Sequence, residues 1–223
     1  MKIVSFNTNS IRLRLHQLKQ LVDTHAPDII GIQETKVVDE EFPVDAIQEL
    51  GYHSEFHGQK THYGVALLSR EKPIAVTKGL PNDNDDSQKR LIVGDFDTPE
   101  GVLRVVNGYF PQGENRSHDV KFPAKEKFYL ELLEYLNDHC DCSKDLALIG
   151  DFNVAPVDAD LGIGEDNVKR WLRTGATCFL PEEREWFATL LDWGLTDSYR
   201  RVYPDSTHYF SWFDYRSRGF ERE

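Results

Sequence analysis

Residues 145–153 read DLALIGDFN, a short apolar run that ends abruptly in a glycine, Asp151, Phe152 and Asn153. Four consecutive apolar residues bounded by polar ones predict a buried strand. A carboxylate and an amide at the exit of that strand would face a cleft at a sheet edge, where oxygen ligands can hold a metal ion for phosphate chemistry. Asp and Asn are also ordinary turn residues, so a simple turn stays the alternative at this point.

Length and composition indicate a single domain spanning residues 1–223. The chain has 39% hydrophobic and 29% charged residues, and a domain of this size buries roughly 70% of the surface of its unfolded chain. No apolar stretch approaches the length of a membrane span, and the N-terminus lacks a secretory hydrophobic region. Only three cysteines are present, which does not suggest a disulfide framework. We therefore expect a cytoplasmic protein without a membrane partner.

The net charge of −12 argues at first sight against a nucleic-acid partner, because proteins that bind the phosphate backbone of nucleic acids usually carry an excess of basic residues. The charge is uneven, however. Acidic residues crowd the region 83–97, whereas basic residues gather around 121–127, 169–173 and 216–218. Such basic clusters can steer a polyanion if they converge in space. The alternative is that each cluster is a solvated helix face.

The hydrophobic periodicity predicts a mixture of strands and helices. Helical spacing begins at Ile11, after a possible cap at Asn9 or Ser10, and stops before Pro27. Strands are predicted at residues 2–6, 29–33, 64–70, 73–78, 90–96 and 102–110, and helices at 43–51, 122–137 and from 181 onward. The run of strands between residues 52 and 109 lacks a crossover helix, which favours antiparallel pairing. The pattern predicts stacked sheets with helices outside.

Three of the apolar strands end in polar groups. The first leads to Asn7, the second to Glu34, and the DLALIGDFN strand to Asp151 and Asn153. Magnesium prefers oxygen ligands and is typically held by one or two carboxylates while the substrate phosphate supplies others. Taken singly, Glu34 could begin a loop and Asn7 could cap a helix. Taken together, the three strand ends predict a metal site.

Seven longer strings occur in order along the chain. They are PDIIGIQETK (27–36), HYGVALL (62–68), NGYFPQG (107–113), GDFN (150–153), RWLRTG (170–175), FLPEEREW (179–186) and FSWFDYRSRGF (210–220). Together they resemble the bacterial exonuclease III branch of the endonuclease/exonuclease/phosphatase superfamily, over the whole chain. The resemblance implies an α/β fold, a four-layer sandwich of two mixed sheets packed face to face with helices outside. It also implies a monomeric, Mg²⁺-dependent DNA repair nuclease, with Mn²⁺ as a substitute ion.

The implied substrate is double-stranded DNA with abasic sites or 3′ ends. The implied activities are 3′→5′ exodeoxyribonuclease, apurinic/apyrimidinic endonuclease and removal of 3′ phosphates. By the same resemblance the metal cluster contains Asn7, Glu34, Asp151 and Asn153. Asp151 would orient or deprotonate the attacking water, Asn153 would hold that water or the phosphate, and Tyr109 would donate to developing charge. Without the resemblance, Tyr109 would be taken as an aromatic residue at a strand end.

Damage recognition is assigned in the same way. Trp212 offers a flat apolar surface for the minor groove beside a missing base, and the alternative is that this aromatic run belongs to the core. Candidate contacts to the DNA backbone, chosen from the resemblance and their donor chemistry, are Arg90, Gln112, Lys121 and Arg216.

Two departures from the family pattern stand out. Ser10 occupies the position of a glycine after the first strand, which is minor if the turn does not need a positive φ. The family also continues into strands with a terminal Asp/His motif that this sequence does not contain. We therefore hypothesise that the sequence is a fragment of a longer reading frame, incomplete at its C-terminus. On this hypothesis the 223-residue chain shows weak or no Mg²⁺-dependent incision of abasic duplex.

Two other functions remain open from the sequence. One is a noncatalytic nucleic-acid-binding relative, which retention of the polar strand ends argues against. The other is a phosphatase of the same superfamily acting on small phosphoesters, which the strings FSWFDYRS and RWLRTG disfavour.

Overall fold

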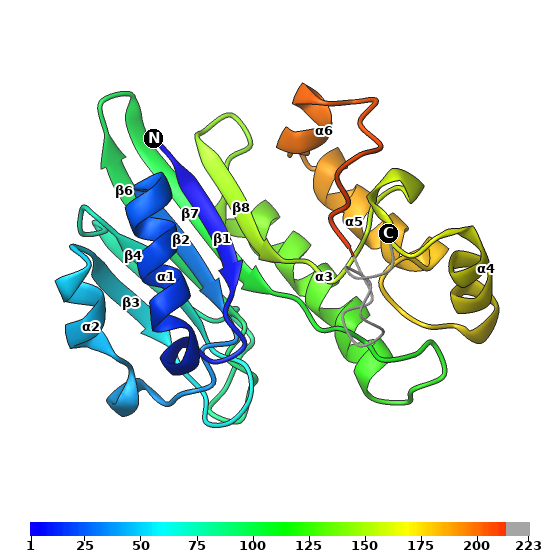
Figure 1. The fold of residues 1–223 in the computed structure, drawn as a ribbon, viewed down its shortest axis with the longest axis horizontal. Coiled ribbons are helices and arrows are strands. Elements are labelled where there is room, and N and C mark those ends of the chain that lie inside the picture. Colours follow the sequence, from blue (N-terminus) through cyan, green and yellow to red (C-terminus); the bar gives the residue numbers. More distant parts are fainter. Residues whose placement is uncertain (213–223) are drawn as a thin grey trace. The chain divides into compact units, whose positions relative to one another are not determined.

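The computed structural model describes residues 1–212, which form two compact units (Figure 1). The sheet unit comprises Met1–Phe110 and Ser143–Phe152. The helical unit comprises Pro111–Cys142 and, among the described residues, 153–212. That these two units belong to a single domain stays a prediction.

The sheet unit contains two four-stranded sheets, and both are mixed. The first has the order β1 (Ile3–Asn7), β2 (Ile29–Gln33), β4 (Val65–Ser69), β3 (His53–His57), with β1 and β2 parallel and the other pairs antiparallel. The second has the order β5 (Ala75–Lys78), β6 (Leu91–Thr98), β7 (Gly101–Tyr109), β8 (Leu146–Asp151), with only β7 and β8 parallel. The predicted α/β class with two mixed sheets is confirmed.

Side chains of β2 and β4 point alternately to the two faces of their sheet, and each face packs into a separate apolar layer. One face of β2 and β4, including Ile30, Ile32 and Leu68, packs against α1 (Ile11–His25) and α2 (Val44–Glu49) through residues such as Leu18. Figure 1 shows α1 lying across this sheet. The other face, which includes Leu67, packs against side chains of β6 and β7. Because β2 is covered on both faces, all five of its residues are buried.

A buried polar network joins the two sheets at their centre. The Asn107 amide, on β7, donates to the backbone oxygens of Ile32 at 3.0 Å and Ala66 at 2.9 Å. Its Oδ1 accepts from Gln33 Nε2 at 2.6 Å. Gly31 makes room for this contact, since a Cβ there would lie 2.9 Å from Asn107 Oδ1. Every polar atom of the Asn107 side chain is thus paired in the interior.

Most strand and helix predictions are confirmed. The strand at 29–33 is found with its predicted bounds, and the helix predicted at 122–137 is α3 (Lys121–His139). The prediction of a buried strand at DLALIGDFN is wrong in one respect, because all six residues of β8 are only partly buried. The reason is that β8 lies at the edge of its sheet within the described chain and pairs with β7 alone.

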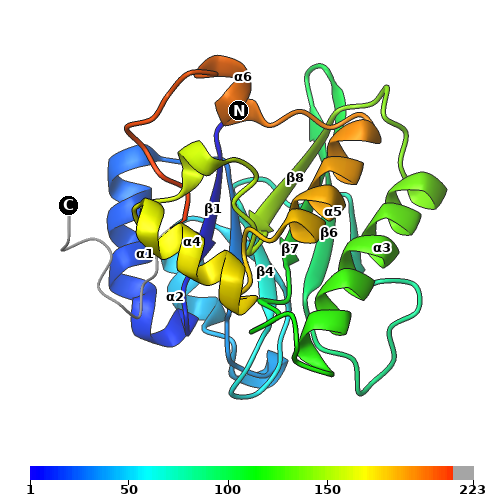
Figure 2. The same ribbon diagram turned by 90° about the vertical axis from the view of Figure 1, so that its right-hand side faces the viewer.

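The helical unit contains α3, α4 (Glu165–Thr174), α5 (Pro181–Asp192), α6 (Ser198–Val202) and the short 3₁₀ helix Asp158–Asp160. Helices α3 and α5 lie side by side (Figure 2). Trp186 of α5 packs its ring against Phe122 and Tyr129 of α3. None of the helices in residues 1–212 is long and apolar enough to cross a membrane.

The turn between β1 and α1 does need a positive φ. Ser10 has φ 92° and ψ 102° and makes no side-chain cap hydrogen bond. A residue with a Cβ is strained in this region of the backbone map. We therefore expect the serine at this position to lower the free energy of unfolding relative to a glycine.

Replacing Asn107 with Leu should lower the free energy of unfolding by about 3 kcal/mol, because it removes a hydrogen-bond donor from the buried oxygens of Ile32 and Ala66 and an acceptor from the Gln33 amide. Urea denaturation measures the change. Asn137→Leu, at an exposed position on α3, is the matched control. A loss no larger than that of the control would contradict the role of Asn107 in joining the sheets.

Replacing Ser10 with Gly should raise the free energy of unfolding by about 1 kcal/mol, because relief of roughly 1–3 kcal/mol of backbone strain exceeds the added flexibility of the unfolded chain. Ser10→Ala keeps the Cβ and should give no gain. Thermal denaturation of both variants tests this, and equal melting temperatures would show that the turn is not strained.

Candidate functional site

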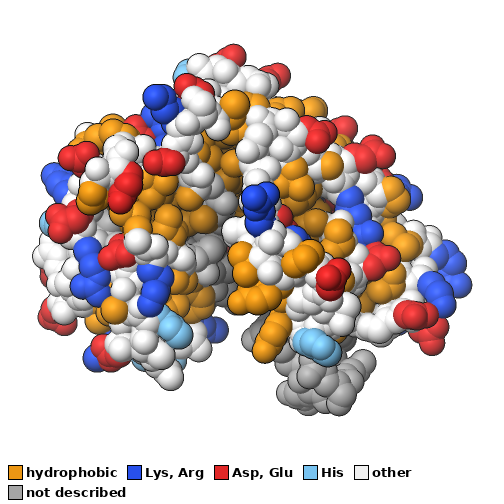
Figure 3. All heavy atoms as spheres, turned by 90° about the horizontal axis from the view of Figure 1, so that it is seen from above, with side chains coloured by type: hydrophobic (Ala, Val, Ile, Leu, Met, Phe, Trp, Pro, Cys, Tyr) orange, Lys and Arg blue, Asp and Glu red, His pale blue; other side chains and the backbone are white. Residues whose placement is uncertain are grey.

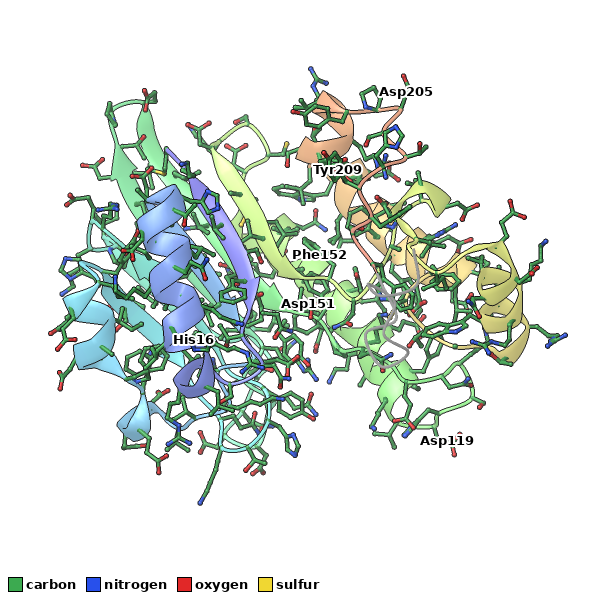
Figure 4. The ribbon with its side chains drawn as sticks, in the orientation of Figure 1. His16, Asp119, Asp151, Phe152, Asp205 and Tyr209 are labelled. Carbon is green, nitrogen blue, oxygen red and sulfur yellow. The ribbon has the colours of Figure 1, made fainter. Side chains whose placement is uncertain are left out.

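The polar ends of four strands gather within the sheet unit. Parallel pairing places Asn7 opposite Gln33, so that Glu34 follows directly at the end of β2. In the second sheet, parallel pairing places Tyr109 opposite Asp151. Gly150 permits this pairing, since a Cβ there would lie 1.9 Å from the oxygen of Gly108. Asp151 thus ends β8 as a strand residue, where Figure 4 labels it.

A single amide nitrogen brings two carboxylates together. Asn7 Nδ2 lies 2.8 Å from Glu34 Oε1 and 2.8 Å from Asp151 Oδ2, and it donates to both. Asn7 Oδ1 faces the other way and accepts from the backbone N–H of Asn9 at 3.0 Å. The three residues come from sequence positions up to 144 apart. The predicted meeting of the first, second and DLALIGDFN strand ends is found in the structure.

Glu34 is held in its ionised form. Burial opposes ionisation, but hydrogen bonds from Lys36 and Asn7 and the charge of Lys36 outweigh it and lower the pKa of the Glu34 carboxyl. Lys36 Nζ lies 2.8 Å from Glu34 Oε2, the oxygen that Asn7 does not contact. The backbone at Glu34 has φ 55°, which turns the chain sharply after β2. At neutral pH the site therefore carries a fixed negative charge at Glu34.

Tyr109 is held as a protonated phenol beside this pair. Burial raises its pKa, and the negative charge of Glu34 raises it further. The guanidinium of Arg90 lies 4.7 Å from the centre of the Tyr109 ring and 4.3 Å from that of Tyr63. Arg90 also donates to the Tyr109 backbone oxygen at 2.9 Å. Tyr109 can therefore act as a hydrogen-bond donor whose position is set by its neighbours.

Arg90 is more buried than is usual for a side chain that contacts DNA from the protein surface. Arg90 is only 8% exposed, and its guanidinium contacts the rings of both Tyr63 and Tyr109. Burial lowers the pKa of its guanidinium. Contact with DNA stays a prediction for Arg90, whereas its support of Tyr109 is visible in the structure.

The carboxylate pair has the chemistry of a hard divalent cation site. Two anionic groups side by side repel each other, and a cation between them would relieve that repulsion. Within residues 1–212 no group of three or more His, Cys, Asp or Glu side chains is placed to hold a metal ion. Mg²⁺ commonly binds to one or two carboxylates and completes its coordination with water and phosphate oxygens, and Glu34 and Asp151 offer such a pair of carboxylates. Asn7 presents its nitrogen here, so in this arrangement it acts as a donor to the carboxylates.

The remaining predicted residues belong to the helical unit. Asn153 has φ 51°, and its carbonyl accepts from Lys125. Gln112 donates through Nε2 to Thr177 Oγ1 at 2.9 Å. Lys121 is exposed and pairs with Glu114. Their roles stay predictions.

Trp212 and Arg216 complete the predicted set. The Trp212 ring is partly buried and meets Trp171 and Phe179 edge to face, at centroid distances of 4.9 and 5.6 Å. Part of this ring therefore serves the local core, as the alternative interpretation allowed, while its use against DNA stays a prediction. Arg216 lies outside the described residues.

Sequence reasoning missed three charged residues that shape these groups. Lys36 pairs with Glu34 and lies only two residues after it, which was the available signal. Lys125 and Glu183 form a buried pair 58 residues apart, for which the sequence offered only the basic cluster around 121–127.

On the face of the molecule shown in Figure 3, basic and acidic side chains are interspersed.

Comparison with known proteins identifies the family to which the chain belongs. A model of the endonuclease/exonuclease/phosphatase family matches residues 4–220. Exodeoxyribonuclease III of Haemophilus influenzae is 54% identical over 221 residues, covering 99% of this chain and 83% of that protein. A Neisseria 3′ phosphatase, solved with a product DNA hairpin, has a TM-score of 0.87 and 39% identity over 100% of this chain and 82% of that one.

An AP endonuclease from Archaeoglobus fulgidus has a TM-score of 0.82 and 31% identity, covering 98% of this chain and 82% of that one. The similarity extends across nearly the whole chain in each case. With the paired carboxylates at the strand ends, these matches show that the chain belongs to the endonuclease/exonuclease/phosphatase family.

Proposed function

We propose that this chain is a DNA repair nuclease that hydrolyses phosphodiester bonds in duplex DNA. The activities proposed are those that the names of its relatives give: 3′→5′ exonuclease on DNA, apurinic/apyrimidinic endonuclease and removal of 3′ phosphates. The observation that carries the proposal is the contact of Glu34 and Asp151 with one amide nitrogen of Asn7. We propose that the chain acts as a monomer on DNA with abasic sites or 3′ ends.

Nucleases of this family depend on a divalent metal ion, and we propose Mg²⁺, with Mn²⁺ as a substitute. Glu34 and Asp151 would hold the ion through their carboxylate oxygens. When bound, the ion would neutralise charge on the phosphate and on the departing oxygen. The lowered pKa of Glu34 keeps a ligand available in ionised form across the neutral range.

The remaining steps belong to the protein's own side chains. Asp151 would accept the proton of the attacking water or orient that water toward phosphorus. Asn153 would hold the water or a phosphate oxygen through its amide. Tyr109, whose raised pKa keeps it protonated, would donate to a phosphate oxygen as negative charge develops there. Asn7 would fix the orientation of both carboxylates.

Recognition of the duplex would use side-chain hydrogen-bond donors and one aromatic ring. Gln112, Lys121 and Arg216 would contact backbone phosphates, and Trp212 would press against the gap left by a missing base. An abasic nucleotide has no base to unstack, so it is the easiest nucleotide to displace from the duplex.

Replacing Asp151 with Asn should lower the rate of incision of an abasic duplex by roughly 10²- to 10⁴-fold, because the proton acceptor and one charged ligand are lost together. Single-turnover reactions with protein in excess over a labelled duplex make even a slow wild-type rate measurable. Asp145→Asn, at the exposed start of the same chain segment, is the matched control and should leave the rate unchanged. EDTA should abolish incision.

Two results would contradict the proposed function. Selective binding of abasic duplex without metal, and without incision under any metal condition, would indicate a noncatalytic binding protein. Faster hydrolysis of small phosphomonoesters than of abasic DNA would indicate a phosphatase of the same family.

A further inference from the structure

A fully buried lysine is hydrogen-bonded to the backbones of two of the proposed functional residues. Lys125, on α3, has a side chain that is 0% exposed. Its ammonium donates to the backbone oxygen of Asn153 at 2.7 Å, to that of Gln112 at 3.3 Å and to Glu183 Oε1 at 2.5 Å. An ammonium has three N–H donors, so all of them are used. Lys125 thus joins the backbones of two proposed functional residues to one carboxylate.

Glu183 anchors the lysine from the other side. Its side chain is also 0% exposed, in the first turn of α5. Glu183 Oε2 accepts from the backbone N–H groups of Cys178 at 2.7 Å and Leu180 at 2.8 Å. Both oxygens of Glu183 therefore have partners, and Lys125 cannot move without disturbing the start of α5.

The neighbouring turn is packed directly on the lysine. Gly113 has φ 87°, and a Cβ there would lie 3.1 Å from Lys125 Cδ and 3.0 Å from Thr177 Cγ2. Thr177 in turn accepts a hydrogen bond from the side chain of Gln112. The backbone and the side chain of Gln112 are therefore both fixed by groups around Lys125.

Stability alone does not account for this pair. Burying two opposite charges carries a large desolvation cost, and well-packed apolar replacements are often neutral or stabilising. What apolar side chains cannot supply is a donor that reaches two backbone oxygens at once. The contribution particular to Lys125 is thus the fixed separation between the Asn153 and Gln112 segments.

We propose that Lys125, anchored by Glu183, is a positioning residue that sets the placement of Asn153 and Gln112 for phosphodiester hydrolysis. The catalytic part of this inference rests on the proposed nuclease function, whereas the structural part does not. Lys125 touches neither substrate nor metal in this proposal and acts only through the two backbones.

Hydrogen exchange of the full chain tests the structural part without any activity. The double variant Lys125→Met/Glu183→Gln removes both buried charges while keeping an acceptor for the Cys178 and Leu180 N–H groups. Peptides covering residues 111–114 and 152–155 should exchange at least about tenfold faster than in wild type, which corresponds to roughly 1.4 kcal/mol of lost protection. Lys127→Met, on an exposed position of the same helix, is the matched control and should leave exchange unchanged.

Single-turnover incision tests the catalytic part. The double variant should lower the rate constant by roughly 10- to 100-fold with little change in the DNA concentration at half-maximal rate, since small displacements of reacting groups slow chemistry more than binding. The same change made in an Asn153→Ala background should have little further effect, because Lys125 acts on the reaction chiefly by placing Asn153. Lys125→Arg, which keeps the donor, should recover part of the rate.

The outcomes separate the two claims. Unchanged exchange in both peptides, or loss of protection spread evenly over the helical unit, would overturn the positioning role. A local increase in exchange with an unchanged rate, or with additive effects alongside Asn153→Ala, would overturn the catalytic part. A wild-type chain that does not cleave DNA would count against the proposed function, while the exchange result would still decide whether Lys125 fixes the two segments.

Discussion

Two carboxylates in contact with one amide nitrogen form the interaction on which the rest of the site depends. Glu34 and Asp151 would repel each other if they were brought together alone, and the Asn7 N–H groups offset part of that repulsion. A bare pair of this kind favours protonation of one member, yet Lys36 and Asn7 keep the pKa of Glu34 lowered. The arrangement therefore retains negative charge where a divalent ion would bind.

The fold supplies this arrangement through the pairing of its strands. Each sheet contributes one parallel pair, β1 with β2 and β7 with β8, so the polar residues that end these strands lie next to each other in each sheet. The Asn107 network then joins the two sheets through the backbones of β2 and β4. Burial of a fully satisfied amide fixes one relative placement of the sheets, which nonspecific apolar packing would leave free to slide. The positions of Asn7 and Asp151 follow from that placement.

Much of this could be predicted from local sequence. The strand predicted at 29–33 matches β2 with its bounds, and the polar residues at the ends of three predicted strands indicated Asn7, Glu34 and Asp151. Features that depend on distant partners could not be predicted. The Lys125–Glu183 pair joins residues 58 positions apart, and neither residue looks different in sequence from a solvated helical charge. The strain at Ser10 and the exposure of β8 depend on a turn geometry and on the sheet order, which periodicity does not report.

The most direct test of the central claim is to locate a paramagnetic ion on the protein. Substoichiometric Mn²⁺ added to the labelled chain broadens backbone amide signals close to the bound ion. The account predicts that the signals of Asn7, Glu34 and Asp151 broaden first, and that Asp151→Asn removes the effect. Broadening confined to the acidic residues 83–86, with the strand ends unaffected, would contradict the assignment of the metal site.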